Sequence, residues 1–421
     1  MQRIVSPSLS TPNPMSSPRQ PALGFVFVTV LLDVLGIGLI IPILPKLVEQ
    51  FQDGNLAVAS SMVGFLASLY ALMQFLFSPV LGCLSDRFGR RPVILASLFG
   101  SGLDYVLLAF APNLSWFFVG RLVAGITGAN ITAATAYIAD ISPPEKRSSN
   151  FGMIGGAFGL GFIVGPALGG LLGEYQLRLP FLVSAGLALA NWLYGYFVLP
   201  ESLSPAHRRP FDWSRANPVG SLSSLRRYPV VIRMATVLFL SSLAQFMLHS
   251  IWAMYTDYRF HWTPTQVGLS LTFVGVMAGV VQGGLSRKVI PWLGEPRSIV
   301  VGLALGAASY LGYGLASHGW MIYAVLMVGC LGGISGPAAQ GIVSRSVGPH
   351  EQGAVQGALT SLSSLAGIVA PLVATHLFGI FIGPEAPVQL PGIAFFVSAF
   401  LTLLALILSI RAVRSVPALK S

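Results

Sequence analysis

The chain has 421 residues, of which 54% are hydrophobic and only 9% are charged, and its mean hydropathy is +0.75. Soluble globular proteins carry about 25% charged residues, so this composition excludes an ordinary soluble domain and predicts a membrane protein. The net charge of +10 could indicate a nucleic-acid partner, but the distribution of the basic residues along the chain accounts for it without one.

Twelve apolar segments are long enough to cross a bilayer, which takes roughly 20 residues at 1.5 Å of rise per residue. The first 21 residues, rich in Pro and Ser, are expected to form a mobile cytoplasmic tail, because no short apolar segment with a cleavage site precedes the first span. The sequence therefore predicts an all-α membrane protein with twelve transmembrane helices. These spans are 22–45, 58–81, 92–111, 115–138, 150–173, 179–199, 231–254, 265–290, 298–316, 320–343, 353–380 and 391–411.

The basic residues set the expected orientation. If the amino terminus is cytoplasmic, twenty of the 24 Lys and Arg lie in the tails or in the loops after even-numbered spans. Lys46, Arg178 and Arg259 lie on the other side, and Arg121 lies within a span. This positive-inside distribution predicts a multi-pass protein of the inner (plasma) membrane with both termini in the cytoplasm, and it leaves no need for nucleic acid.

Three charged residues lie within predicted spans of the first half. Asp33 is about eleven residues from either end of span one, and Asp104 lies in span three. Burial favours the protonated form of a carboxylic acid, so both can carry a proton, although an acid that only holds a neighbouring helix is the plainer alternative. Arg121 in span four keeps its proton, so it either tunes a nearby carboxylate or reaches the membrane interface with its long side chain.

Uncharged polar groups point to a pathway rather than to catalysis. Gln74 in span two and Gln282 in span eight offer amides to a central cavity, or else cross-link helices without touching a substrate. The six histidines are scattered without metal-ligand spacing, and Cys83 and Cys330 are too few for a disulfide framework. We therefore expect neither a metal nor a cofactor, and we do not expect a membrane-embedded enzyme.

The segment between spans two and three, from Gly82 to Pro92, reads GCLSDRFGRRP and combines an acid, three arginines and two glycines. We expect a loop in which Asp86 pairs with arginines across the ends of adjacent helices, while Gly89 permits a tight turn. Asp140, after span four, is expected to join it. The plainer alternative is that the arginines only anchor the topology. The predicted cytoplasmic gate comprises Gly82, Asp86, Arg87, Gly89, Arg90, Arg91 and Asp140.

Span five carries glycines at helical spacing. Such a stripe lets another helix backbone approach closely, and a proline inside it can bend the helix. The pattern comprises Gly152, Gly161, Gly165, Pro166, Gly169 and Gly170.

The longest loop, between spans six and seven, divides the chain into two halves. A shift of 205 residues overlays Gly128 on Gly333 and Pro166 on Pro371, which predicts two pseudo-symmetric six-helix bundles. The repeat also places Arg345 opposite Asp140, and a shift of 201 places Arg287 opposite Asp86, both with the sign reversed. The predicted units are a tail at 1–21, a bundle at 22–199, a linker at 200–230, a bundle at 231–412 and a tail at 413–421.

These motifs resemble those of the major facilitator superfamily, in particular its twelve-span drug:H+ antiporter branch. The first half is most similar to the tetracycline-efflux family, through segments that begin at Leu32, Tyr70, Ser85 and Leu103. The resemblance implies proton-driven export by alternating access. It implies that Asp33, Asp104 and Arg121 couple transport to protons, that Gln74 and Gln282 line the substrate pathway, and that the span-five pattern is an antiporter motif.

Two departures from that family affect the expected substrate. Ala278 stands where the family has a histidine in span eight, and Gly306 stands where it has an aspartate in span nine. The second half lacks these two ionisable groups, which argues against tetracycline itself and leaves proton coupling to the first half. We expect a monomeric secondary transporter that exports a small amphipathic compound. The alternatives are an exporter of a metabolite or siderophore and a non-transporting membrane sensor.

Overall fold

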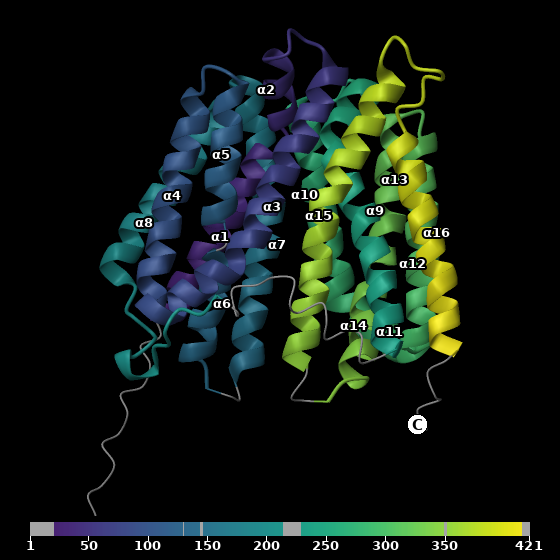
Figure 1. The fold of residues 1–421 in the computed structure, drawn as a ribbon. Helices are drawn as coiled ribbons and strands as arrows, with labels where there is room; N and C mark the ends of the chain where they lie inside the picture. Colours follow the sequence, from purple (N-terminus) through teal and green to yellow (C-terminus); the bar gives the residue numbers. More distant parts are fainter. Residues whose placement is uncertain (1–20, 129, 144–145, 214–228, 349–351, 415–421) are drawn as a thin grey trace, which may run out of the picture.

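The computed structural model describes residues 21–128, 130–143, 146–213, 229–348 and 352–414, and every regular element in these ranges is helical (Figure 1). Twelve segments are long and apolar enough to span a membrane, which confirms the predicted number. The helices are α1 (Pro21–Ile40), α2 (Leu44–Gln50), α3 (Leu56–Phe88), α4 (Arg90–Phe110), α5 (Leu114–Thr127), α6 (Asn130–Ile141), α7 (Arg147–Tyr175), α8 (Leu179–Val198), the short η2 (Pro205–His207), α9 (Pro229–Phe260), α10 (Pro264–Val280), the π-helical η4 (Val281–Leu285), α11 (Ser286–Leu293), α12 (Glu295–Leu315), α13 (Gly319–Gly332), α14 (Ser335–Arg345), α15 (Gln352–Ile382) and α16 (Ile393–Arg414).

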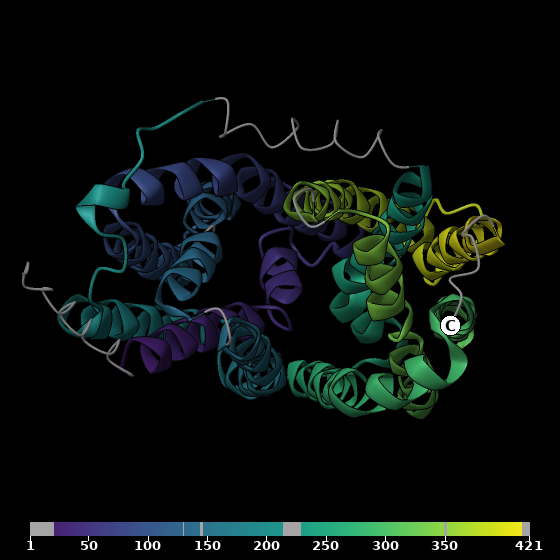
Figure 2. The same cartoon turned by 90° about the horizontal axis from the view of Figure 1, so that it is seen from below.

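The helices form two groups that lie side by side, α1 to α8 and α9 to α16 (Figure 1), and the view from below shows the same division (Figure 2). We call the end of the bundle where α3 meets α4 the basic end, and the opposite end, which carries α2, the α2 end. Of the predicted linker, 200–213 and 229–230 lie within the described residues. The predicted tails lie almost wholly outside them.

The two groups touch each other near the α2 end. α3 packs against α15, where the Ser60 hydroxyl donates to the carbonyl of Thr375 at 3.1 Å and the Ser68 hydroxyl donates to the carbonyl of Ile368 at 2.7 Å. α7 packs against α10, where the Thr272 hydroxyl donates to a carbonyl of α7 at 2.8 Å. Hydroxyl-to-carbonyl bonds of this kind join helices in lipid, where the hydrophobic effect does not.

Toward the basic end the same helices diverge. A Cβ atom added to the glycines in the first turns of α7, or to those at the end of α10 and in η4, would meet nothing within 4 Å. Glycines nearer the α2 end of α7 are packed against other helices. Among the described residues, the helices at the basic end, α6 in the first group and η4, α11 and α14 in the second, likewise make no substantial contact with the other group. The two groups are therefore joined toward the α2 end and separated at the basic end. The open positions are Gly152, Gly155, Gly156, Gly159, Gly279, Gly283 and Gly284.

Two sequence-based expectations about element boundaries are wrong. The segment from Gly82 to Pro92 is not a loop, because α3 continues to Phe88 and α4 begins at Arg90. Span one ends at Ile40 rather than at residue 45, since a turn at 41–43 containing Pro42 separates α1 from α2. Asp33 is therefore about 10 Å from the α2 end of α1, rather than at the middle of the helix.

Candidate functional site

A charged pair lies inside the first half, where α4 faces α5. Asp104 of α4 is only 2% exposed, and its Oδ2 lies 3.8 Å from Nη2 of Arg121 in α5. Neither oxygen of this carboxylate accepts a hydrogen bond within the described residues. A Cβ on Gly120 would lie 2.8 Å from Oδ1 of Asp104, so the glycine lets α5 approach α4 closely. That approach brings together two charges of which neither is stable alone inside a membrane.

Tyr70 and Gln74 of α3 border this pair. The guanidinium of Arg121 lies over the Tyr70 ring, 5.9 Å from its centroid, a position in which the ring face attracts the cation. The amide nitrogen of Gln74 lies 3.4 Å from the Tyr70 hydroxyl and 3.3 Å from the carbonyl oxygen of Gly128. In this conformation the Gln74 amide therefore cross-links α3 to the end of α5.

Asp33 of α1 belongs to the same group of residues. Its side chain is half-buried, and Tyr105 of α4 interacts electrostatically with both Asp33 and Arg121. The Tyr105 hydroxyl packs on α1, since a Cβ on Gly36 would lie 3.1 Å from it. The structure thus brings the predicted ionisable residues of α1, α4 and α5 together around two tyrosines. Sequence reasoning did not assign these tyrosines to the site, although each lies beside a residue that it did assign.

Gln282, the other predicted pathway amide, is not part of this cluster. It lies in η4 of the second half, where it is exposed and makes no hydrogen bond within the described residues. A π-helical turn of this kind is frequent at functional sites, but the predicted role of Gln282 stays a prediction. The described residues contain no group of His, Cys, Asp or Glu that could hold a metal ion.

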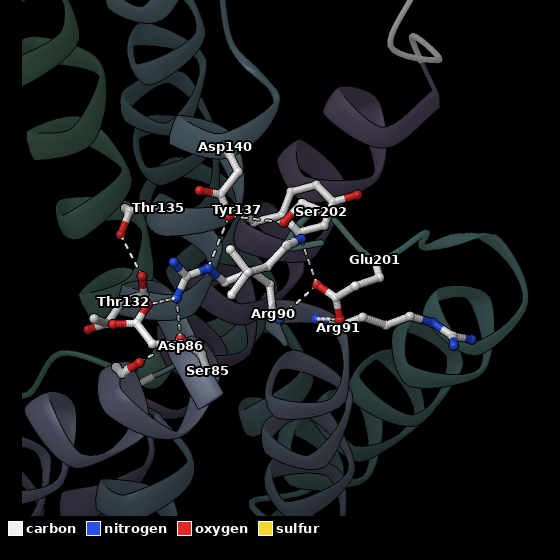
Figure 3. Close-up of polar contacts among 12 residues, drawn as sticks. Ser85, Asp86, Arg90, Arg91, Thr132, Thr135, Tyr137, Asp140, Glu201 and Ser202 are labelled. Atoms are coloured by element: carbon white, nitrogen blue, oxygen red, sulfur yellow. Dashed lines mark hydrogen bonds and ion pairs between the residues drawn. The ribbon is translucent and has the colours of Figure 1, made fainter. Parts of the chain in front are cut away.

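A second cluster lies at the basic end, where α3 meets α4 across Gly89 (Figure 3). Arg90 is at its centre, with Nη1 2.6 Å from Oδ1 of Asp86 and Nε 3.1 Å from Oδ2 of Asp140. Gly89 has a φ of +106°, which lets the chain turn within one residue. The predicted pairing of Asp86 and Asp140 with an arginine therefore forms, as a junction of α3, α4 and α6.

Glu201, which sequence reasoning missed, completes this junction. Its carboxylate accepts the backbone N–H of Arg90 at 2.9 Å and of Arg91 at 3.3 Å, so it caps the first turn of α4 (Figure 3). Nη2 of Arg91 donates to the carbonyl of Tyr196 in α8 at 2.6 Å. The available signal was an isolated acid directly after the last span of the first half, at an end where most charges are basic.

The remaining residues of the predicted gate lie at the edge of the junction. Arg87 lies over the Phe88 ring, 5.0 Å from its centroid, and a Cβ on Gly82 would lie 3.6 Å from Thr132 of α6. All the partners described for this cluster belong to the first half or to the start of the linker that follows it. In this conformation the junction therefore joins helices of one half, and its role as a gate between the halves stays a prediction.

The second half repeats the junction with its charges exchanged. A shift of 205 residues carries the glycine, arginine and aspartate of the first junction onto Gly294, Glu295 and Arg345. Gly294 has a φ of +78°, and the Glu295 carboxylate pairs with the Arg345 guanidinium. The sequence indicated the reversed sign at Arg345 but not its partner. Arg287 is exposed at the start of α11.

The glycines of α7 face two different helices. Gly170 lies against the backbone of Pro264 in α10, and Gly268 of α10 lies against the carbonyl of Pro166. Pro166 does not interrupt α7, whereas Gly152 lies where the two groups diverge. The pattern therefore serves both the packing inside the first half and the contact between the halves. The glycines packed against α1 are Gly161, Gly165 and Gly169.

The α2 end carries an ion pair between the halves that the sequence did not predict. Nζ of Lys46 in α2 lies 3.3 Å from Oδ1 of Asp257 in α9. Glu49, one turn after Lys46, lines a pocket of about 490 Å³ beside Asp257. Burial, and then the nearby Asp257 carboxylate, raises the pKa of Glu49 above its usual range, while Lys46 acts in the opposite direction.

Comparison with known proteins gives matches over most of the chain. The profile described as Major Facilitator Superfamily matches residues 26–371. Tetracycline resistance protein, class C, of Escherichia coli is 42% identical over 357 residues, which cover 85% of this chain and 89% of that protein. The class B protein of Escherichia coli is 35% identical over 363 residues, with 86% and 88% covered.

Solved structures agree in fold. The human organic anion transporter TETRAN superposes with a TM-score of 0.68 at 27% identity, covering 93% of this chain and 99% of that one. A bacterial homolog of the human lysosomal transporter Spinster, in an inward-facing and occupied conformation, superposes with a TM-score of 0.76 at 14% identity. It covers 95% of this chain and 98% of that one, and it supports the fold alone.

The second-half junction, in which the signs of the charges are reversed, can be tested by swapping its two charges. Arg345→Glu should lower thermal stability in detergent and transport, because it places two carboxylates next to each other in the second-half junction. Arg345 is 54% exposed at its side chain, so the coupling energy should be modest, about 0.5 kcal/mol. The double variant Glu295→Arg with Arg345→Glu should recover most of both losses, as measured by the melting temperature and by uptake into vesicles.

Arg90→Glu in the first-half junction is the matched comparison. The Arg90 side chain is 10% exposed and has two acidic partners. Reversing its charge should therefore lower the melting temperature more than Arg345→Glu does. A double variant at 295 and 345 that is no better than the worse single variant would contradict a direct pairing.

Glu49 leads to a pH prediction. Its pKa is raised in the closed arrangement of the α2 end and returns toward its usual value when that end opens, so binding of a proton favours the closed form. Lowering the pH from neutral toward the usual carboxylate range should therefore increase the closed population. Spin labels at exposed Tyr175 and Val388, one on each half, report the opening as a longer distance. In Glu49→Gln the distance distribution should no longer depend on pH over this range; an unchanged dependence would assign it to another group.

Proposed function

The chain belongs to the major facilitator superfamily, and we propose that it exports a small amphipathic organic compound in exchange for protons, as a transporter of the tetracycline-efflux type. The observation that carries this proposal is the cluster of Asp33, Asp104 and Arg121 inside the first half. The similarity to tetracycline resistance proteins supports the direction of transport and the class of substrate. In this proposal the protein works as a monomer without a cofactor.

The cluster has the chemistry that proton exchange needs. Arg121 keeps its charge, whereas a buried carboxylic acid exchanges a proton readily when its surroundings change. With both Asp33 and Asp104 ionised, the three side chains carry a formal charge of −1, and one bound proton brings that charge to zero. A proton or a cationic group of the substrate can supply the same compensation, which makes the two compete for one site.

The arrangement of the two halves supports a mechanism of alternating access. They are joined toward the α2 end and separated at the basic end. We propose that the halves rock about the cluster, opening the α2 end once a substrate is bound. In this proposal the Arg90 junction at the basic end is the gate. The glycine pattern of α7 is the surface along which the helices of the two halves move past each other.

The substrate is proposed as a class rather than as tetracycline alone. Ala278 and Gly306 of the second half carry no ionisable group, so recognition there differs from that in the tetracycline-efflux family. An endogenous metabolite or siderophore exported by the same mechanism is the alternative. Growth of a drug-hypersensitive bacterial host on a panel of compounds, with and without this protein, separates a drug exporter from both the alternative and a non-transporting sensor.

The orientation is proposed from charge. Twenty of the 24 Lys and Arg lie in the tails or in the segments that follow even-numbered spans, and the described ones among them lie at the basic end. From the positive-inside rule we propose that this end faces the cytoplasm and that the protein lies in the inner membrane. The described conformation is then open to the cytoplasm, as an exporter must be when it collects its substrate.

A labelling experiment tests this orientation. In a background that lacks Cys83 and Cys330, Ser204→Cys at the basic end should be shielded from a membrane-impermeant thiol reagent in intact cells. Gln50→Cys, at the α2 end, should react, because it is exposed at the last residue of α2. Asn55 is less suitable, since its side chain caps α3. The opposite labelling pattern would reverse the proposed direction of transport.

Asp33→Asn tests proton coupling. The substitution keeps the shape of the side chain and removes its titration, so uphill export driven by a pH gradient should fall to the level of empty liposomes. Counterflow down a substrate gradient should persist with weaker binding, because Asp104 remains as an acid that can face the substrate while the titrating group at position 33 is lost. The assay uses substrate-loaded proteoliposomes with an imposed pH step.

Asp53→Asn is the matched control, because Asp53 is an exposed acid whose positive φ of 53° suits asparagine equally well. It should transport like the unmodified protein. Coupled accumulation at the unmodified level in Asp33→Asn would move the coupling role to Asp104.

A further inference from the structure

An imidazole and an amide lie together on α9, within a membrane span of the second half. Nε2 of His249 lies 3.4 Å from the amide nitrogen of Gln245, one helical turn earlier. Both side chains are exposed in the structure although α9 packs against several helices. An ionisable side chain inside a span is costly, so its position calls for a functional explanation. Nothing in the proposed proton cluster uses it.

The other faces of α9 have identified neighbours. Phe246 packs against Gly367 of α15, the indole of Trp252 donates to Ser270 of α10 at 2.9 Å, and the carbonyl of Ala244 accepts a bond from α16. At about 100° per residue, positions 245 and 249 fall between the sector that faces α10 and the sector that faces α15. Those two helices form the contacts with the first half. The pair therefore faces the interior between the halves rather than lipid.

The pair also lies at the level of the proton cluster. Phe246 packs on Gly367, and the next residue of α15, Ile368, accepts the hydrogen bond from Ser68 of α3. Tyr70 follows Ser68 by two residues and lies under the Arg121 guanidinium. This chain of direct contacts, which passes from α15 to α3, connects the level of Gln245 and His249 to that of Arg121 in the other half.

The helices around α9 bring no carboxylate to this level. In sequence α10 has no titratable residue, α15 has only His376, and the arginines of α14 and α16 lie at the basic end. α3 contributes Tyr70 here, and its charged residues lie at the basic end. Lys46 and Glu49 of α2 lie at the opposite end, beside Asp257. Among these elements, His249 is the group at this level that can gain a positive charge by titration.

Building on the proposed function, we propose that His249 and Gln245 form the second-half part of the transport site and bind the substrate directly. The Gln245 amide, as placed, donates to Nε2 of the imidazole, so the neutral ring carries its proton on Nδ1. That proton can be donated to an oxygen of the substrate. Protonation of the ring turns both nitrogens into donors, so the amide must then present its carbonyl instead.

The two sides of the interior thus differ in chemistry, and this difference specifies a substrate class. The acids of the first half suit a protonated amine, whereas the imidazole and amide of the second half suit oxygen acceptors. A compound that carries a basic nitrogen on one edge and several oxygens on the other, on a rigid apolar frame, satisfies both. Tetracycline has this chemistry and is the probe for the test.

The kinetic test compares His249→Asn with the unmodified protein in proteoliposomes. His249→Asn should raise the KM for tetracycline roughly tenfold, the effect of one hydrogen bond to a group that can be charged, and should change kcat less. The KM of the unmodified protein should change as the pH is lowered through the range in which the imidazole gains its second proton. That variation should be absent in the variant. His376→Asn, a histidine of α15 outside the proposed site, is the matched control and should keep both properties.

A second measurement reports contact directly. In the background without Cys83 and Cys330, His249→Cys should react with a small thiol reagent, and tetracycline should slow the reaction. If His249→Asn does not fold, Gln245→Ala takes its place in the kinetic test with the same expected rise in KM.

The two levels of proposal fail in different ways. If the unmodified protein accumulates no tetracycline, the proposed function is wrong for this probe, and the site at His249 is then decided by whether tetracycline protects His249→Cys from the thiol reagent. If the unmodified protein does accumulate tetracycline, while His249→Asn keeps its KM and its pH profile and His249→Cys is not protected, transport stands and the proposed site at His249 is overturned.

Discussion

A charged side chain inside a bilayer has no water around it, so it is stable only where the protein supplies a group that compensates its charge. The architecture of the first half depends on supplying such groups. Arg121 is held between the carboxylate of Asp104 and the ring face of Tyr70, and Gly120 permits the close approach of α4 and α5. Once such a pair exists, the carboxylate can give up or accept a proton while the arginine keeps its charge. The need for compensation and the capacity for proton exchange therefore have the same physical origin.

The two junctions at the basic end show that the fold conserves a pairing rather than a sign. The residue after the positive-φ glycine is Arg90 in one half and Glu295 in the other, and each pairs with an opposite charge 50 residues later. An arginine in the first turn of a helix opposes the helix dipole, whereas a glutamate there is favourable. This difference explains why α4 has Glu201 bound to its first N–H groups, while α12 supplies its own acid.

Local sequence was enough for the spans and for the ionisable residues within them. Apolar length gave twelve spans, and the cost of buried charge singled out Asp33, Asp104 and Arg121, which the structure brings together. Contacts between distant segments had no such signal. Glu201 reaches Arg90 across 111 residues, and Lys46 meets Asp257 in the other half, and neither has a spacing that a single sequence reveals. The segment around Gly89 was misread as a loop because its glycines and charges are typical of turns, although one glycine completes the turn and helices begin on either side.

The direct connection of α3 to α4 through Gly89 has a mechanical consequence. α3 is 33 residues long, about 50 Å, and it touches α15 near one end while its other end is tied to Arg90 and, through Arg90, to α6 and Glu201. A one-residue joint held on several sides has almost no slack, so a tilt of α3 at the α2 end displaces the junction at the basic end at once. α3 therefore couples movement at the α2 end of the bundle to movement at the basic end. In the proposed alternating-access cycle, this coupling keeps the two ends from opening together, which is the condition that keeps an exchanger from leaking protons.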